Sequence, residues 1–458
     1  MSRPALLTRL LPRRRNDYPG WLNALIDFVA DHPMSLPGRI AALRLGIPRA
    51  AARPGVSDPG EGDPRLLIAP VNYSDQSTQW ARAVREALPG ASTATMAIDV
   101  AGGFSFPSDL VVPVPTYHND RVWQGAQRDA VRGFTHVLVE AEEPLFGRLM
   151  RRESAREIAW MRASGIDVAC IAHGTDIRVP SAHAEREELS PYRDSDLYSQ
   201  RLERVTRQNI TMLRESGRPL FVSTPDLLLD LPEAVWCPVV VDPDRWAAAD
   251  TTARDAVGGT GREAVREADA RPASEAPDAA APLRVLHAPS VSLVKGTQLV
   301  EPVLHRLEAE GIISYRAIRG VPAAEMPAAY AEADIVLDQF RLGSYGVAAC
   351  EAMAAGKLVI GHISEQVRQR VREDSGLELP IVEATPESLE GVLREIARDR
   401  AALDRARAEG TAFVKRWHSG GESAAVLIRH WIAPEQAATH QSTASPTARA
   451  RETDQEGE

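Results

Sequence analysis

The stretch DIVLDQFRLGSYGVAACEAMAAGKLVIG (residues 334–361) determines the predicted fold. It begins with an apolar run at 334–340, passes through a loop of small residues into a helical pattern at 346–355, and returns to an apolar run at 357–363. Gly356 stands where the C′ residue of that helix is expected, because glycine adopts the left-handed conformation at no steric cost. A strand–loop–helix–strand order of this kind is typical of a parallel sheet covered by helices.

The same alternation runs through the rest of the second half of the chain. Apolar runs predict strands at 283–289, 313–319, 334–340, 357–363 and 379–384. Helical patterns are predicted at 296–310, 322–333, 346–355, 364–373 and 386–399. Gly311 fits the C′ position of the first of these helices, and Thr385 and Pro386 fit the N-cap and first-turn positions of the last.

The first half repeats this pattern less clearly. Its strand candidates are 65–70, 93–99, 109–114, 135–141, 166–172 and 219–224, and a helix is expected at 76–88. Alternation of short apolar runs with helical patterns again predicts a parallel sheet. The expected fold class is therefore α/β, with two Rossmann-like domains facing across a cleft.

A segment poor in large apolar residues separates the two halves. Residues 247–281 are rich in alanine, glycine, proline and scattered charges, and their largest apolar residue is valine, which predicts a flexible linker. The tail after residue 433 is similarly polar, which predicts disorder. The predicted organisation is a basic arm with leading helices at 1–64, a first domain at 65–246, the linker at 247–281, a second domain at 282–418, a helix crossing back to the first domain at 419–433, and the disordered tail at 434–458.

Composition excludes several functional classes. The 458 residues carry 53 Lys and Arg against 63 Asp and Glu, a net charge of −10, which disfavours a protein that binds the nucleic-acid backbone. No apolar run approaches the ~18 residues of a spanning helix, and the basic start lacks the apolar core of a secretion signal. Cys170, Cys237 and Cys350 are widely spaced, which is typical of a reducing compartment. We therefore expect a soluble cytoplasmic protein.

Ligands bind such sheets beyond the carboxyl ends of the strands, so candidate chemistry is expected in the loops that follow them. The chain has no GxSxG elbow, no P-loop and no GxGxxG after its first strand. Elbow-type hydrolases, P-loop NTPases and ordinary NAD enzymes are therefore disfavoured.

A lysine follows the first predicted strand of the second half. Lys295, Gly296 and Thr297 open the helical pattern at 296–310. A cation beside the free N–H groups of a helix N-terminus suits a phosphate. A solvated lysine in a strand-to-helix loop is the competing interpretation.

A second candidate site follows the predicted strand at 334–340. Small residues let the backbone approach a ligand, and the N–H groups at the start of the helix suit a diphosphate. Glu351 lies in an apolar stretch of that helix, so it is expected either to bond hydroxyl groups or to be capping or ion-paired. The candidate ligand-binding residues of this segment are Gly343, Ser344, Tyr345, Gly346, Val347 and Glu351.

Two further candidate sites follow strands of the first half. His173 and Asp176 come directly after the predicted strand at 166–172, where a substrate in the cleft would be within reach. A structural histidine is the alternative interpretation. Asn72 and Tyr73 follow the first strand and are candidates for the acceptor side, with an ordinary helix-opening turn as the alternative.

In order and spacing, these segments resemble the family 4 glycosyltransferases of the two-Rossmann GT-B type. The similarity runs over most of residues 66–432 and is strongest in 283–363. The resemblance implies transfer of a sugar from a UDP- or GDP-sugar with retention of anomeric configuration, with no metal and no other cofactor. It implies catalytic roles for Lys295 on the donor diphosphate, for Glu351 on the ribose hydroxyls, and for His173 at the transferred sugar.

Two positions depart from the pattern of that family. Ser290 stands where an arginine usually makes a second phosphate contact, and Gly343 stands where a glutamate usually contacts the donor sugar. Losing a charged phosphate contact removes roughly 1.5–3 kcal/mol of charge-assisted bonding. Arg319 and Arg341 are the candidates for a replacement cation.

Two other functions remain open on the same architecture. A nucleotide-sugar 2-epimerase would form product without an acceptor, and a non-catalytic nucleotide-sugar-binding protein would bind the donor without turnover. The expected partners are a nucleotide sugar and a carbohydrate, lipid or small-molecule acceptor, with no nucleic acid. The arginine-rich residues 1–15 are expected to make a weak contact with an anionic membrane surface at the inner face, with a free basic arm as the alternative.

Overall fold

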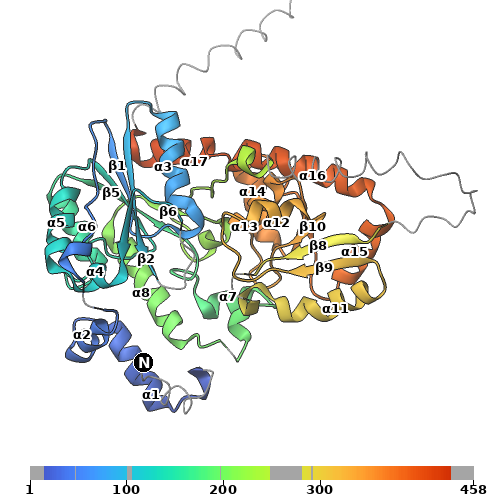
Figure 1. The fold of residues 1–458 in the computed structure, drawn as a ribbon, viewed down its shortest axis with the longest axis horizontal. Coiled ribbons are helices and arrows are strands. Elements are labelled where there is room, and N and C mark those ends of the chain that lie inside the picture. The colour runs from blue at the N-terminus through green and yellow to red at the C-terminus, as the bar shows by residue number, and fades with distance from the viewer. Residues whose placement is uncertain are drawn as a thin grey trace, which may run out of the picture.

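The computed structural model describes residues 15–46, 48–100, 106–195, 197–247, 281–289 and 292–434. The arm up to residue 14, nearly all of the predicted linker at 247–281, the tail from residue 435 and the candidate residue Ser290 lie outside the described residues. The rest of the chain forms two α/β domains (Figure 1), each built on its own parallel sheet.

Seven parallel strands form the sheet of the first domain, in the order β3-β2-β1-β4-β5-β6-β7. They are β1 (Arg65–Ala69), β2 (Ser92–Asp99), β3 (Leu110–Pro113), β4 (His136–Glu140), β5 (Asp167–Ala172), β6 (Leu220–Val222) and β7 (Val235–Trp236). In the register, Leu67 of β1 lies between Ala94 of β2 and Val137 of β4. All three side chains are buried, because helices cover both faces of the sheet and its central strands are apolar along their length.

The helices of the first domain begin and end at recognisable signals. They are α3 (Gln76–Ala87), α4 (Val114–Asn119), α5 (Arg121–Val131), α6 (Ser154–Ala163), α7 (Pro180–Arg186) and α8 (Gln200–Ser216). The carboxylate of Asp120 caps α5 by accepting the N–H groups of Val122 and Trp123. Gly217 ends α8 with a left-handed φ of 60°.

The sheet of the second domain has five parallel strands in the order β12-β11-β10-β8-β9. They are β8 (Leu283–His287), β9 (Ile313–Ala317), β10 (Ile335–Leu337), β11 (Leu358–Gly361) and β12 (Ile381–Glu383). Its helices are α10 (Ser292–Lys295), α11 (Thr297–Ala309), α12 (Met326–Ala331), α13 (Val347–Ala354), α14 (Glu365–Ser375), α15 (Leu389–Arg398) and α16 (Ala401–Phe413). Gly311 and Gly356, predicted as helix C′ residues, have φ of 73° and 66°.

An apolar cluster extends without interruption from the first domain into the second. Trp236 of β7 packs on Trp417, with ring centroids 5.5 Å apart, and Trp246 packs on Tyr330 of α12 at 5.4 Å. Because aromatic side chains bury large areas at low entropic cost, these contacts hold the two domains together beside the cleft.

The end of the described chain returns to the first domain. The helix α17 (Gly421–Leu427) and the π-helical turn Ile428–Ile432 follow α16, and Figure 1 shows α17 beside α3. Leu427 and Trp431 share a buried cluster with Leu66 and Trp80 of the first domain.

Two helices precede the first domain: α1 (Gly20–Asp31) and α2 (Leu36–Leu43). The hydroxyl of Ser35 caps α2 by accepting the N–H of Gly38 at 3.2 Å. Asn119 of α4 donates to the carbonyls of Ala42 and Gly46, which satisfies backbone acceptors at the end of α2.

The expected α/β class with two Rossmann-like domains is confirmed, and the differences are local. The predicted strand at 109–114 ends at Pro113, where α4 begins. The helix predicted from Pro386 begins at Leu389, because Thr385 and Ser388 form a hydrogen-bonded turn before it. The two-residue strand β7 was not predicted, since so short a run has no periodicity to detect.

Candidate functional site

Each sheet has a point at which its strand order reverses. In the first sheet this switch point lies between β1 and β4, and in the second it lies between β8 and β10. Loops leaving two such strands diverge to opposite faces of the sheet, so a crevice opens at their carboxyl ends and receives ligands. The candidate residues after 283–289 and 334–340 belong to the switch point of the second sheet.

A pocket of about 250 Å³ opens at this switch point. Lys295, Gly346, Val347 and Glu351, four of the predicted donor-binding residues, line it together. Its remaining lining residues are Ser74, Phe106, Ala288, Pro289, Ile318, Gly320, Val321, Ala323, Met326, Tyr330 and Ala348. Ser74 and Phe106 belong to the first domain, so the pocket lies between the domains. We refer to it as the switch-point pocket.

Lys295 is held at the wall of the switch-point pocket by a carboxylate. Its Nζ donates to Oδ1 of Asp338 at 2.5 Å, and Asp338 is buried directly after β10. Oδ2 of Asp338 is buried without a hydrogen-bond partner. The ion pair orients the ammonium group, and the amino end of α13, which begins at Val347, lies in the same pocket. The first N–H groups of a helix have no intrahelical acceptor, so lysine and helix together favour an anion.

Glu351 has the electrostatic character of a buried carboxyl. Burial raises its pKa to about 8, an effect opposed by Arg245 and Lys295 and reinforced by Asp75. Asp75 belongs to the first domain, which places α13 opposite the start of α3. A carboxyl group in this setting is suited to bonding hydroxyl groups of a ligand.

A larger pocket of about 580 Å³ lies on the first domain and shares Ser74 and Phe106 with the switch-point pocket. Asn72 and Tyr73, predicted for the acceptor side, line it, as do the charged residues Asp99, Glu143 and Arg152. The other lining residues are Val71, Ala97, Ile98, Val100, Val111, Tyr117 and His118. We refer to it as the first-domain pocket. The two pockets are therefore adjacent.

Asn72 fixes the loop at the boundary between the pockets. Its amide donates to Thr78, to the carbonyl of Pro107 and to Ser108, and its carbonyl oxygen accepts the N–H of Ser77. Its side chain therefore has a structural role. Ser74 and Asp75 in the same loop have φ of 53° and 65°, a conformation that costs a non-glycine residue of order 1 kcal/mol and is found most often at functional sites.

His173 packs behind Tyr73, a residue that lines the first-domain pocket. Its ring stacks on Trp80 at 5.6 Å and meets Tyr73 edge-on at 5.5 Å. Nε2 lies 3.3 Å from Oε1 of Glu140, and that oxygen accepts a hydrogen bond from the hydroxyl of Ser77. Burial raises the pKa of Glu140, against the lowering effect of the contacts with His173 and Ser77. His173 itself does not line either pocket in the described part of the chain.

Asp176 holds the backbone on which His173 stands. Its carboxylate accepts the N–H of His173 at 2.6 Å and those of Gly174 and Ile177. This is a turn-capping arrangement, so the carboxylate of Asp176 orients the loop after β5.

The predicted donor residues 343–345 lie at the domain interface and not in the switch-point pocket. Ser344 donates to Asp226 of the first domain at 2.6 Å, and the hydroxyl of Tyr345 is 3.2 Å from Nε2 of His418. Gly343, with φ of 63°, lies against the carboxylate of Glu187.

The two candidate replacement cations are also engaged elsewhere. Arg341 donates to the carbonyls of Leu189 and Ser190 and pairs with Asp194 at 3.0 Å, so it binds the first domain. Arg319 is largely exposed and forms an ion pair of 3.4 Å with Glu301. Gly296 is the N-cap residue of α11, with φ of 77°, and the side chains of Arg341 and Phe340 lie close to it.

Sequence reasoning missed several residues that line these pockets or act on residues beside them. Asp338 and Glu140 are carboxylates at the carboxyl ends of buried strands, which is the signal that could have identified them. Phe106 carries no motif, and its place depends on how the two domains meet, whereas Ser74 belongs to the polar loop after the first strand that the sequence did indicate. Arg245, whose charge lowers the pKa of Glu351, precedes the predicted linker and was likewise unmarked.

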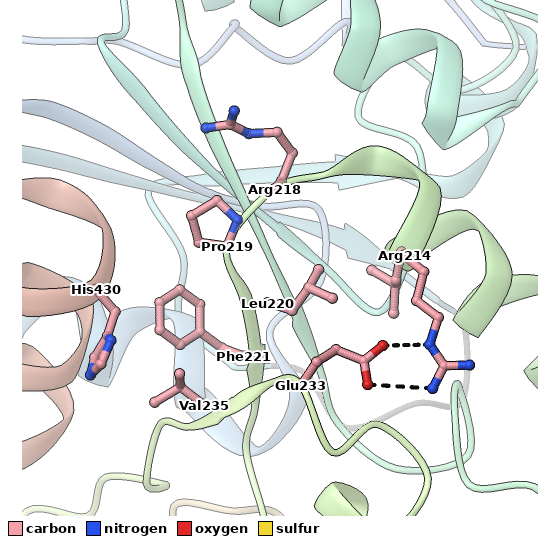
Figure 2. A pocket seen from close by; sticks show the side chains of 9 residues that line it. Arg214, Arg218, Pro219, Leu220, Phe221, Glu233, Val235 and His430 are labelled. Atoms are coloured by element: carbon pink, nitrogen blue, oxygen red, sulfur yellow. Dashed lines mark hydrogen bonds and ion pairs between the residues drawn. The ribbon is translucent and has the colours of Figure 1, made fainter.

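A further hollow of about 450 Å³ lies at the amino ends of β6 and β7 (Figure 2). Arg214 and Glu233, which both line it, form an ion pair (Figure 2), and Arg218 pairs with Asp167. Its charges are thus balanced internally, and it lies at the sheet edge opposite the switch point. It therefore lacks the properties of the two pockets in the cleft.

Within the described ranges, no three His, Cys, Asp or Glu side chains are grouped so that they could hold a metal ion. Nor does any helix in those ranges have the length and apolar character needed to cross a bilayer. The three cysteines are buried and unpaired.

Comparison with known proteins gives structural matches only. No family model and no curated protein sequence matches the chain. Anabaena HepE, solved with UDP and glucose, is 10% identical, with a TM-score of 0.46 over 82% of this chain and 99% of that one. Sucrose-phosphate synthase from Thermosynechococcus elongatus is 12% identical, with a TM-score of 0.47 over 83% and 99%. WaaG, a glycosyltransferase involved in lipopolysaccharide biosynthesis, is 12% identical, with a TM-score of 0.46 over 80% and 99%.

Proposed function

We propose that this chain is a glycosyltransferase of the GT-B type that moves a sugar from a UDP- or GDP-sugar to an acceptor. The main support for the proposal is that Lys295, the amino end of α13 and Glu351 all line one pocket at a switch point. The family 4 resemblance of residues 283–363 assigns the same residues to a nucleotide diphosphate, and it does so independently of the geometry.

The proposed roles follow from the charges that develop during transfer. Cleavage of the glycosidic bond builds negative charge on the leaving diphosphate and positive charge at the anomeric carbon. Lys295 and the N–H groups of Gly346 and Val347 stabilise the diphosphate from fixed positions, so they need no reorganisation in the transition state. Because these groups supply the positive charge, the proposed transfer needs no metal ion.

Glu351 is proposed to accept hydrogen bonds from the ribose hydroxyls of the nucleotide. Its raised pKa reflects burial without a strong partner, and two hydroxyl donors would compensate the buried carboxylate. Ligand binding would then lower the pKa of Glu351 toward its ordinary range.

The first-domain pocket is proposed to receive the acceptor. It adjoins the switch-point pocket at Ser74 and Phe106, so an acceptor hydroxyl there would meet the donor sugar at the boundary. Tyr73 forms part of its wall, and His173 behind Tyr73 is proposed to act by positioning that ring. Retention of configuration is part of the proposal and rests on the resemblance alone.

A non-catalytic nucleotide-sugar-binding protein is the second candidate. It is favoured by the engagement of Arg341 with the first domain and by the ion pair of Arg319 with Glu301, which leave Lys295 as the cation lining the described pocket. One fewer cation weakens stabilisation of the leaving group more than it weakens ground-state binding.

Release of the nucleoside diphosphate distinguishes the transferase from the non-catalytic binding protein. It is measured after the protein is incubated with a panel of UDP- and GDP-sugars and acceptors. Acceptor-dependent release that is lost in Lys295→Ala and kept in Arg319→Ala supports transfer. Binding of a nucleotide sugar without release supports the non-catalytic candidate. Product formed without an acceptor, with no nucleoside diphosphate released, contradicts both.

A further inference from the structure

The two helices that precede the first domain expose their apolar faces. In α1, Trp21, Leu25 and Phe28 are 69%, 49% and 45% exposed, and in α2, Leu36, Ile40 and Leu43 are 72%, 55% and 56% exposed. Within each helix the spacing is i, i+4 and i+7, which places the three side chains on one face. We call these six residues the apolar face.

The polar side of α1 is turned into the protein. Asn23 and Asp27 are its buried residues, and Asp27 accepts hydrogen bonds from Arg15 at 2.6 Å and from Tyr198 at 2.8 Å. Asp31 pairs with Arg201 at 2.9 Å and with Arg204. The helix is thus anchored by its polar face, the reverse of the usual arrangement in a globular protein. Exposure of the apolar face is therefore built into the fold.

Charge is distributed unevenly in the same part of the chain. Residues 1–53 contain nine arginines and three aspartates, a formal charge of +6, whereas the whole chain carries −10. Asp27 and Asp31 are paired with arginines, and of the nine arginines Arg15 and Arg53 are paired with Asp27 and Asp120. Arg39 and Arg44 are exposed and directly adjoin Ile40 and Leu43 in the sequence, and Arg49 is exposed in the segment after α2.

We propose that the apolar face of α1 and α2 docks on an anionic lipid bilayer, with the surrounding arginines at the headgroups. Apolar side chains including a tryptophan, flanked by arginines, match the boundary between acyl chains and negative headgroups. A second copy of the chain is a poorer occupant, because pairing two such faces would bring the exposed Arg39 and Arg44 of both copies close together. Figure 1 shows α1 and α2 projecting from the first domain. The surface lies outside both pockets and does not depend on the proposed function.

Vesicle sedimentation tests this docking with matched variants. The full-length protein is mixed with vesicles of phosphatidylcholine alone or of phosphatidylcholine with phosphatidylglycerol. The triple variant Trp21→Ser/Leu25→Ser/Phe28→Ser removes half of the apolar face, and Val122→Ser/Leu229→Ser/Leu299→Ser removes three other exposed apolar side chains as a control. Circular dichroism and the thermal midpoint check that both remain folded.

We expect the natural protein and the control to bind phosphatidylglycerol vesicles, and the apolar-face variant to partition at least about tenfold more weakly. Arg39→Glu/Arg49→Glu should weaken binding to the anionic vesicles and reduce its dependence on salt. Failure of the natural protein to sediment, or equal binding by the apolar-face variant, would overturn the proposal. So would a dimer in light scattering that the apolar-face variant converts to monomer, because a second copy would then cover the face.

Discussion

Glu187 of the first domain lies so close to Gly343 of the second that a β-carbon at Gly343 would stand 2.3 Å from Oε1 of Glu187. The other oxygen of Glu187 is 3.3 Å from Nε2 of His362, and Nδ1 of His362 is 2.7 Å from Glu383. The loop after β10 is therefore closed against the first domain at the position where the resembled family carries a glutamate.

Gly343→Ala should destabilise the protein by more than the cost of placing an alanine in the left-handed conformation. The left-handed φ of 63° costs an alanine about 1 kcal/mol, and the new methyl group also displaces Glu187. Gly376→Ala is the matched control, since its φ is 67° and no atom lies within 4 Å of its added β-carbon. Chemical denaturation measures both, and equal losses in the two variants would contradict the close contact.

Loss of Asp226 should cost far more stability than loss of a similar ion pair at the surface. Asp226 and Arg178 are both buried, and their 2.6 Å ion pair is joined by the hydroxyl of Ser344. Asp226→Ala leaves the guanidinium buried and unpaired, so we expect a loss of about 3–5 kcal/mol in the free energy of unfolding. Glu233→Ala breaks the exposed pair with Arg214 seen in Figure 2 and should cost at most about 1 kcal/mol. Similar losses in the two variants would contradict this account.

The packing of the loop after β10 against the first domain should become less stable as the pH rises. Hydrogen bonds to Glu187 and Glu383 raise the pKa of His362 from 6.5 to about 9, so its folded form holds a proton that its unfolded form releases. The resulting stability is complete below pH 6.5 and is lost as pH rises through about 9. The advantage of the natural protein over His362→Gln should therefore shrink across that window, by at most about 1.4 kcal/mol per pH unit. A difference that stays constant with pH would show that His362 is not protonated there.

Glu351 should also lower the free energy of unfolding as the pH rises, over a lower pH range than His362. Its pKa is raised from 4.5 to about 8, so the folded form keeps a proton that the unfolded form loses above pH 4.5. Glu351→Gln removes the ionisable group, so its free energy of unfolding relative to the natural protein should increase between about pH 4.5 and 8, by at most about 1.4 kcal/mol per pH unit. Denaturation curves at several pH values measure the difference. A relative stability that stays constant with pH would indicate a glutamate with an ordinary pKa.

The strands of the second domain could be predicted because burial on both faces makes them apolar along their length. The run at 283–289 contains β8, and the run at 357–363 contains β11, each with an error of one or two residues at its ends. In the first domain, α4 was missed because Val114 continues the apolar run of β3, and no capping residue marks the change.

The predicted site residues fall into two groups, those that line the switch-point pocket and those that lie at the domain interface, and the difference has a physical reason. Lys295 and Glu351 follow strands at a switch point, and topology alone brings such residues to one crevice. Tyr345 and Arg341 occupy the same loop, but their direction depends on partners more than 70 residues away in sequence, in segments that local patterns cannot pair. The placement of Gly343 against Glu187 is likewise a tertiary contact without a local signal.

Titration calorimetry of UDP and GDP binding tests the anion site most directly. The comparison is between the natural protein and Lys295→Gln/Asp338→Asn, a double variant that removes the cation without leaving Asp338 as a buried unpaired charge. Arg319→Gln serves as the control, because Arg319 lies outside the pocket. We predict at least about tenfold weaker binding in the double variant and unchanged binding in the control. Unchanged affinity in the double variant would place the diphosphate elsewhere and contradict the site.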